Sequence, residues 1–288
     1  CSSFGAITTT GAVSLDGPVS LATGAITVDS SAGNGAIDFL HTIDGAQNLT
    51  LSSGSGAVDV NGIIGSTTAI GTLTVNASGT GTIAIEQIGD GDPASGSLGA
   101  TIGNTGTTSV TFDGTEYTMN GATTVTAQSG DSIIFSGGGA TTFTTSNDAI
   151  TFGNVASGGT LTIDTNASSN AADISIGAIA AGVNDTITLK TGDNVAGADI
   201  TVSGAVSNNS NFQLINVGGT ATFNNNQAVI NGSLASISQD YYKVYKLASD
   251  SEAAVKHIPN VPDQSSYLIK YVTSDGLPFP DISFDLAG

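Results

Sequence analysis

Short strand-like tripeptides that recur along most of the chain constrain its fold more than any other feature. Each places a small, mostly polar residue between two apolar or β-branched residues, as in Val13-Ser14-Leu15, Leu49-Thr50-Leu51 and Leu73-Thr74-Val75. Because successive side chains of a strand point to opposite faces, the apolar pair shares one face and the middle residue lies on the other. Gly, Asn, Asp and Ser separate the tripeptides, which is typical of tight turns. The same pattern recurs at 25–28, 57–60, 83–85, 110–112, 133–135, 150–152, 161–163, 174–176, 187–189 and 200–202.

The tripeptides repeat at a nearly constant interval. Leu49 precedes Leu73 by 24 residues, and Leu161 precedes Ile187 by 26 within two similar segments. Repeats of about 20 to 30 residues, each too small to bury its own apolar face, are typical of solenoids. We therefore expect an all-β fold, a β-solenoid in which each turn lays its strands on those of the previous turn. The alternative is an antiparallel β-sandwich or a pair of sandwiches, which also contain many short strands.

Composition divides the chain near residue 233. Residues 1–232 carry the repeats, whereas residues 233–288 hold four of the five lysines and five of the six tyrosines. In the second segment, Ser249 and Glu252 have the spacing of a capping box, which predicts one short helix among strands. We expect residues 1–232 to form the solenoid and residues 233–288 a small α+β cap or docking segment. Residues 89–109 are less regular and are expected to loop out or to distort a turn.

The charge of the chain excludes several classes of partner. It carries 24 acidic residues against five lysines, a formal net charge of −19. Nucleic acids and anionic membrane surfaces need clustered basic residues, so neither is expected as a partner. No apolar run is long enough to predict a transmembrane helix. An acidic surface of this kind favours a secreted, extracellular protein over a cytosolic enzyme.

The single cysteine stands at position 1 and cannot form an internal disulfide. Cys1 followed by Ser2 and Ser3 resembles the start of a mature bacterial lipoprotein, in which this cysteine carries the lipid. The alternative is a fragment of a longer chain that happens to begin at cysteine.

The sequence offers little for catalysis, and we expect no enzyme. His41 lies near Asp44, but nothing in the sequence predicts a serine nucleophile beside them. One cysteine and two distant histidines do not form a zinc motif. The polysaccharide lyases that share solenoid folds need a basic residue at the uronate, and the chain has no arginine.

Two acidic features are candidates for calcium binding. Asp90 and Asp92 lie in the sequence GDGDP, which resembles an acidic Ca²⁺ loop but lacks the remaining ligands of an EF-hand. Asp173 and Asp199 occupy equivalent positions in two repeats, so they are expected on adjacent coils about 4.8 Å apart. Such a pair favours a solvated ladder or a weak Ca²⁺ site over a catalytic dyad. No other cofactor is expected.

The repeats resemble a known group of proteins. The segments that begin at Gly71, Gly159 and Ile187 contain the sequences GTLTV, GTLTID and ITLKTGDNVAGADITVSGAV. This cadence, over roughly residues 5–230, resembles filamentous-haemagglutinin-like and related β-strand-repeat surface proteins of bacteria. The resemblance implies a secreted β-solenoid, a right-handed parallel β-helix, that acts in adhesion, biofilm or surface layers.

The ends of a solenoid suggest how it would assemble. A solenoid has two sheet edges with free backbone groups, and the repeats of this chain begin within its first residues. We expect an uncapped N-terminal edge that pairs with the C-terminal segment of the next copy, giving a head-to-tail surface filament or matrix. The expected apolar anchors of this interface are Phe4, Ile7, Tyr267, Ile269 and Phe284. The alternative is a monomeric adhesin or carbohydrate-binding module that binds surface glycans through flat Thr and Asn ladders.

Overall fold

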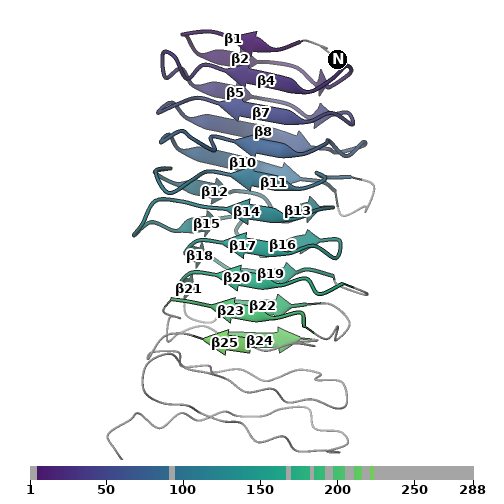
Figure 1. Cartoon of the computed structure of the whole chain (residues 1–288), viewed down its shortest axis with the longest axis vertical. Helices are drawn as coiled ribbons and strands as arrows, with labels where there is room; N and C mark the ends of the chain where they lie inside the picture. The colour runs from purple at the N-terminus through teal and green to yellow at the C-terminus, as the bar shows by residue number, and fades with distance from the viewer. Residues whose placement is uncertain are drawn as a thin grey trace, which may run out of the picture.

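The chain forms a β-solenoid of about eight turns (Figure 1). The structure, a computed structural model, describes residues 5–90, 95–166, 170–181, 185–191, 197–204, 211–215 and 221–223. The regular secondary structure of these segments consists of β-strands, and neighbouring strands run parallel, as in the pairs β1–β4, β2–β5 and β10–β12. The predicted solenoid is therefore confirmed, and the alternative of an antiparallel sandwich is wrong.

One side of the solenoid is a ten-stranded parallel sheet, to which each coil contributes one strand. In spatial order its strands are β1 (Ile7–Thr8), β4 (Ile26–Asp29), β7 (Leu49–Ser52), β9 (Leu73–Val75), β11 (Ala100–Ile102), β14 (Thr123–Val125), β17 (Ile150–Phe152), β20 (Ile174–Ile176), β23 (Ile200–Val202) and β25 (Ala221–Phe223). Figure 1 shows these strands stacked along the long axis of the molecule.

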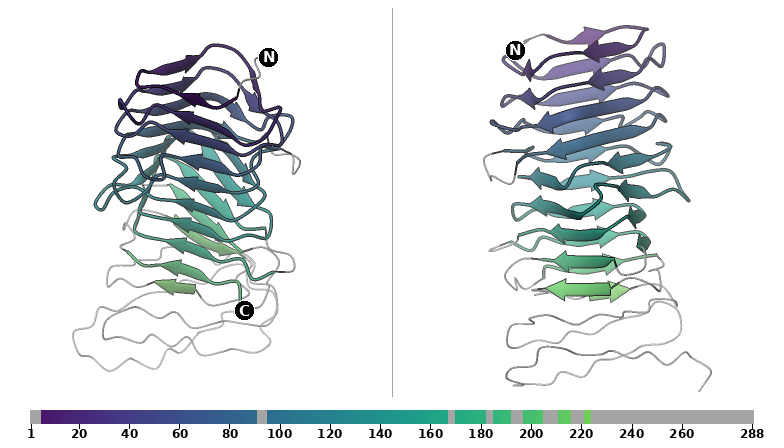
Figure 2. Two further views of the ribbon diagram at one scale, coloured as in Figure 1. Left: turned by 45° about the horizontal axis from the view of Figure 1, so that its top comes forward. Right: turned by 180° about the vertical axis from the view of Figure 1, so that it is seen from behind.

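The remaining strands form a fifteen-stranded sheet that consists of two ladders. Ladder 1 contains β2 (Val13–Leu15), β5 (Ile37–Phe39), the first halves of β8 (Val58–Ile64) and β10 (Ile83–Ile88), β12 (Val110–Phe112), β15 (Ile133–Phe135), β18 (Val155–Ser157) and β21 (Ile179–Ala181). Ladder 2 contains β3 (Val19–Ser20), β6 (Ile43–Asp44), the second halves of β8 and β10, β13 (Glu116–Met119), β16 (Ala140–Thr145), β19 (Thr160–Asp164), β22 (Thr186–Lys190) and β24 (Asn211–Ile215). Each full coil passes the ten-stranded sheet, ladder 1 and ladder 2 in turn, as the views in Figure 2 show.

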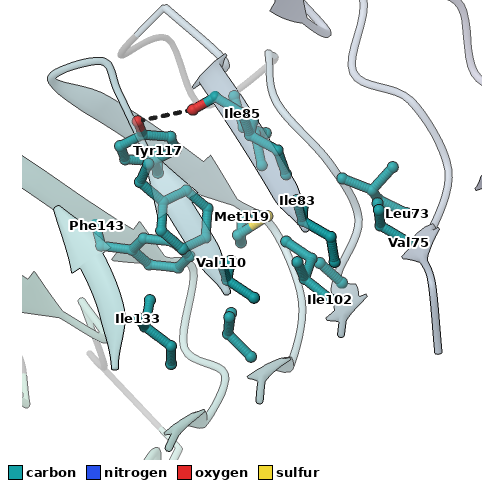
Figure 3. Packing of buried hydrophobic residues seen from close by; sticks show 14 of the residues in the cluster. Leu73, Val75, Ile83, Ile85, Ile102, Val110, Tyr117, Met119, Ile133 and Phe143 are labelled. Atoms are coloured by element: carbon teal, nitrogen blue, oxygen red, sulfur yellow. Dashed lines mark hydrogen bonds between the residues drawn. The ribbon is translucent and has the colours of Figure 1, made fainter. Parts of the chain in front are cut away.

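The core lies between the ten-stranded sheet and the two ladders, and Figure 3 shows part of it. Inward side chains of successive coils stack in register, so Leu49 lies level with Leu73 in the ten-stranded sheet and both are fully buried. The middle coils add aromatic stacks: the rings of Phe112 and Phe135 lie 5.1 Å apart, and those of Tyr117 and Phe143 lie 5.6 Å apart. These side chains supply the apolar burial that stabilises a fold of short strands.

Glycines allow the corners between the ten-stranded sheet and ladder 1 to stack closely. A Cβ atom on Gly81 would overlap the carbonyl oxygen of Gly56 on the preceding coil, and one on Gly56 would lie 2.6 Å from the carbonyl oxygen of Gly35. Close approach of backbone to backbone is therefore the reason for glycine at these corners.

The coils differ in length more than the sequence repeat suggests. Leu73 is level with Ala100, 27 residues later, whereas Ile200 is level with Ala221, only 21 residues later. The predicted 26-residue match of Leu161 with Ile187 is confirmed. The extra residues lie at corners, where they do not disturb the ladders.

Two expectations from the sequence need correction. The similar segments GTLTV and GTLTID do not occupy equivalent places, because Leu73 lies in β9 of the ten-stranded sheet and Leu161 in β19 of ladder 2. The stretch 89–109, expected to loop out or to distort a turn, contributes β11 to the ten-stranded sheet. Pairing with β9 and β14 on either side gives these residues a strand conformation that their own sequence does not predict. The predicted segment 233–288, with its helix, lies outside the described residues.

Candidate functional site

The outer face of the ten-stranded sheet carries a column of hydroxyl side chains, which we call the threonine column. Each of its strands from β4 to β23 places one Thr or Ser outward between two inward residues, and the strand register aligns these residues from coil to coil. The members of the column are Thr27, Thr50, Thr74, Thr101, Thr124, Thr151, Ser175 and Thr201. Because stacked strands lie about 4.8 Å apart, the column presents one hydroxyl group at each such interval.

The middle of the column is the most accessible part. Thr101, Thr124 and Thr151 are exposed, whereas the residues before and after each of them in the strand are buried. The next outward positions along these three strands carry only glycine, alanine and threonine, at 99, 122 and 149 on one side and 103, 126 and 153 on the other. The centre of this face is therefore uncharged and has no bulky side chain.

The outward column of ladder 1 has no such uniformity. Its aligned residues are Ser14, Asp38, Asp59, Ala84, Thr111, Ile134, Ala156 and Ala180. Burial raises the pKa of Asp59, and a hydrogen bond from Asn61 lowers it. The neighbouring carboxylates of Asp38 and Asp113 raise this pKa further, so that the net shift is upward. Ladder 1 thus shows that the fold accepts charged, apolar and polar residues at outward positions.

Polar side chains at the corners tie each coil to the next beside the threonine column. The Oδ1 atom of Asn48 accepts the Thr72 backbone N–H at 2.9 Å, one residue before β9. Asp173 repeats this contact, and its Oδ1 atom accepts the Asp199 N–H at 2.8 Å. The predicted placement of Asp173 and Asp199 on adjacent coils is confirmed by the pairing of β20 with β23, and this hydrogen bond gives Asp173 a structural role.

A buried asparagine holds the corner at the other end of β9. Asn76 is almost fully buried and has a positive φ of 43°. Its Oδ1 accepts the Ser53 N–H at 2.8 Å, and its Nδ2 donates to the Ser53 Oγ at 2.7 Å. Sequence reasoning predicted asparagine at corners, because asparagine tolerates the left-handed region.

The first coil presents the strand ends at which assembly was predicted. In the described part of the chain β1, β2 and β3 stand at the ends of their ladders. Ile7 and Leu15 point toward the core but are only half-buried, whereas their counterparts on later coils, such as Val28 and Phe39, are fully buried. Of the predicted interface residues, Ile7 is the one that the structure describes; Phe4, Tyr267, Ile269 and Phe284 lie outside the described residues, as does Cys1.

The candidate catalytic and metal sites do not converge in the described residues. The His41 Nε2 lies 3.3 Å from the Asp16 carboxylate, and both side chains are largely exposed. Asp44 instead accepts the Thr67 N–H at 2.8 Å and the Ser66 hydroxyl at 2.9 Å. Asp90 donates its backbone N–H to Ser95 Oγ at 3.0 Å.

Asp92, the second predicted calcium ligand, lies outside the described residues. Within the described segments, no three His, Cys, Asp or Glu side chains are grouped to hold a metal ion. Calcium binding through Asp90 and Asp92 therefore stays a prediction.

Sequence reasoning named Thr ladders in general but did not identify the threonine column. The signal was present, because the tripeptides of the ten-stranded sheet are ITV, LTL, LTV, ATI, TTV, ITF, ISI and ITV in chain order. What was missing was the assignment of each tripeptide to a sheet. The described segments contain no helix that is both long enough and apolar enough to span a membrane.

No family model, curated protein or solved structure matches this chain. The structure supports the resemblance to bacterial β-strand-repeat proteins at the level of the fold, because both are β-solenoids.

Proposed function

We propose that this chain is an extracellular structural protein of the bacterial cell surface, a subunit that assembles head to tail into a filament or matrix. The observation that carries the proposal is the first coil, where three parallel strands end their ladders together and leave Ile7 and Leu15 half-buried. A second copy whose last coil docked on this edge would continue all three ladders and cover both side chains.

The backbone groups available for this docking follow from the hydrogen bonds of the first coil. The Thr9 N–H donates to the Asp29 carbonyl, and the Val13 N–H donates to the Ala36 carbonyl, both toward the second coil. Alternate residues of a parallel strand bond to opposite neighbours. The N–H and C=O groups of Thr8 and Ser14 therefore point away from the second coil, in the direction from which an added strand would bind.

Parallel strands give the assembly a direction. All strands of one ladder run the same way, so the first and last coils present different edges, and the contact between copies is heterologous. Such a contact continues without closing and produces a linear filament. The high negative charge opposes lateral association of filaments in low salt.

Proline substitutions at the open edge test this assembly. Ser14→Pro combined with Thr8→Pro removes two N–H groups that point away from the second coil, and edge strands tolerate proline at such positions. We expect wild-type protein to form uniform fibres by negative-stain microscopy and the double variant to remain a folded monomer by sedimentation. Ser14→Ala, which keeps the N–H group, should assemble as wild type.

A wild-type chain that remains monomeric at every concentration would contradict the proposal, and so would unchanged fibres of the double variant. That first outcome is expected for the second candidate function, a monomeric adhesin or glycan-binding module. The threonine column is the observation that favours this candidate, because it is an extended polar face that the core does not require. The proposed lipid anchor at Cys1 would be tested separately by intact mass.

A further inference from the structure

The threonine column is a periodic surface, and its period is set by the backbone. Its members are held in register by the main-chain ladders, and polar corner contacts such as that of Asn48 with Thr72 fix the adjacent residues. The hydroxyl groups therefore recur at about 4.8 Å without depending on side-chain packing. A ligand that uses several of them at once must repeat at a similar interval.

The composition of the column is not explained by the fold. Threonine suits strands in general, and ladder 2 aligns Thr142, Thr162 and Thr188, preceded by Glu116. Ladder 1, however, has one threonine, Thr111, at its aligned outward positions, and neither ladder is uniform along its length. In a chain with net charge −19, the column carries no charged residue, although Asp29, Asp173 and Asp199 lie at the next outward positions of β4, β20 and β23. The column itself, and above all its centre around Thr101, Thr124 and Thr151, is uniform and neutral, which points to a ligand that is itself uniform and neutral.

The chemistry of threonine narrows the class of ligand. Each side chain offers a hydroxyl that both donates and accepts hydrogen bonds, next to a methyl group that orders the surrounding water. A carboxylate or ammonium group would instead organise water around its own charge. The oxygen atoms of hexagonal ice repeat along one crystal axis at a spacing close to that of stacked β-strands.

We propose that the threonine column binds the surface of ice. Water molecules held between the hydroxyl and methyl groups of adjacent coils join the crystal lattice, and each exposed hydroxyl adds a small contribution. Binding is strong only where several coils in succession match the lattice, so the accessible centre around Thr101, Thr124 and Thr151 dominates it.

A glycan is a poorer fit to the same surface. Sugar rings are commonly bound by stacking on aromatic side chains, and the six aromatic side chains that the structure describes are all buried. They are Phe39, Phe112, Tyr117, Phe135, Phe143 and Phe152.

The proposal is tested by the growth of single ice crystals in solutions of the purified full chain. We expect faceted crystals and a gap between the melting and freezing temperatures. Thr124→Tyr, which places a bulky side chain in the middle of the column, should abolish most of this gap. Thr111→Tyr, the matched change on the outward column of ladder 1, should leave it unchanged.

Two further variants keep the test decisive. Thr151→Lys introduces charge at another exposed position of the column and should also abolish the gap, which covers the case that Thr124→Tyr does not fold by circular dichroism. The Ser14→Pro and Thr8→Pro double variant should retain ice activity per molecule, because this site does not depend on assembly.

Rounded, unmodified ice crystals with the wild-type chain would overturn the proposal, as would equal activity of Thr111→Tyr and the folded column variants. Binding to crystalline cellulose or chitin without any effect on ice would assign the column to a polysaccharide instead and would also overturn it.

Discussion

The ten-stranded sheet and ladder 1 are built from the same kind of strand and face the same core, yet their outer surfaces differ. Inward, both carry fully buried aliphatic side chains, such as Leu73 and Ile85. Outward, one shows seven threonines and one serine in register, and the other shows acidic, apolar and polar residues. The core therefore dictates one side of each strand and leaves the other side free, so uniformity outside requires its own explanation.

The largest effect is expected for inward positions, where the two faces should respond alike. Leu73→Ala in the ten-stranded sheet and Ile85→Ala in ladder 1 each delete a fully buried side chain and should lower the free energy of unfolding by about 2–5 kcal/mol. Chemical denaturation measures both changes. A much smaller loss on one face would show that the core does not constrain the two faces equally.

A corner substitution should have a somewhat smaller effect. Gly81→Ala places a methyl group onto the Gly56 carbonyl of the preceding coil, so the corner must shift, at a cost of about 1–3 kcal/mol. Gly130→Ala is a poor control, because Gly130 has a φ of +96°. Gly139→Ala, where a Cβ meets no atom within 4 Å, is the matched control and should be nearly neutral. Equal losses for both variants would contradict the close stacking of corners.

The acidic part of ladder 1 should respond to pH, whereas the threonine column should not. Partial burial, more than its acidic neighbours, raises the pKa of Asp59 in the folded protein, so the folded state binds this proton more tightly than the unfolded state does. The ionised Asp59 therefore costs stability at neutral pH, and this cost disappears as the pH falls through the raised pKa.

Asp59→Asn should accordingly raise the melting temperature at pH 7 and have little effect once Asp59 is protonated in acid. Asp38→Asn removes a neighbouring charge but not the burial of Asp59, so its effect should be smaller. Thermal melts across this pH range provide the measurement. If the melting temperatures of Asp59→Asn and wild type differed by the same amount at every pH, the raised pKa of Asp59 would be contradicted.

The smallest effect is expected in the threonine column itself. Thr124→Ser removes an exposed methyl group from a position whose counterpart in β20 is already Ser175, and it should change stability by at most about 0.5 kcal/mol. Ile134→Ser on ladder 1, at a side chain 38% exposed, is the comparison. A large loss from Thr124→Ser alone would mean that the fold needs threonine there and would remove the reason to assign the column a function.

Much of the fold was predictable because inward residues repeat in the sequence. The thirteen tripeptide-type segments predicted within residues 1–232 all fall on strands, with Ala25 and Ala57 one residue before β4 and β8, and Val13-Ser14-Leu15 coincides with β2. Several of the strands that were missed have small or polar residues at inward positions, as in Val155–Ser157 and Thr123–Val125, and adjacent coils supply their backbone partners. The sequence of such a strand carries no signal for the hydrogen bonds that adjacent coils provide.

The site was less predictable because it depends on how tripeptides are distributed among three ladders. Leu73-Thr74-Val75 and Leu161-Thr162-Ile163 have nearly the same sequence but lie in different sheets. Coil length decides this, and it varies because corners absorb extra residues: seven residues, 30–36, connect β4 to β5, whereas two, 153–154, connect β17 to β18. The periodicity of side chains cannot reveal where the extra residues leave the ladder.

Because the coils pair in register, a whole coil can be removed or added without disturbing the pairing of the others. Thr123 is level with Ile150, so removal of residues 123–149 would join Ala122 to a residue that continues the same rung and would leave a rod shorter by one coil. A tandem duplication of the corresponding stretch of gene would lengthen the rod in a single step and add one more hydroxyl to its outer row. Mutation can thus change the length of the solenoid and the number of its repeated surface groups together, while the packing of the core stays the same.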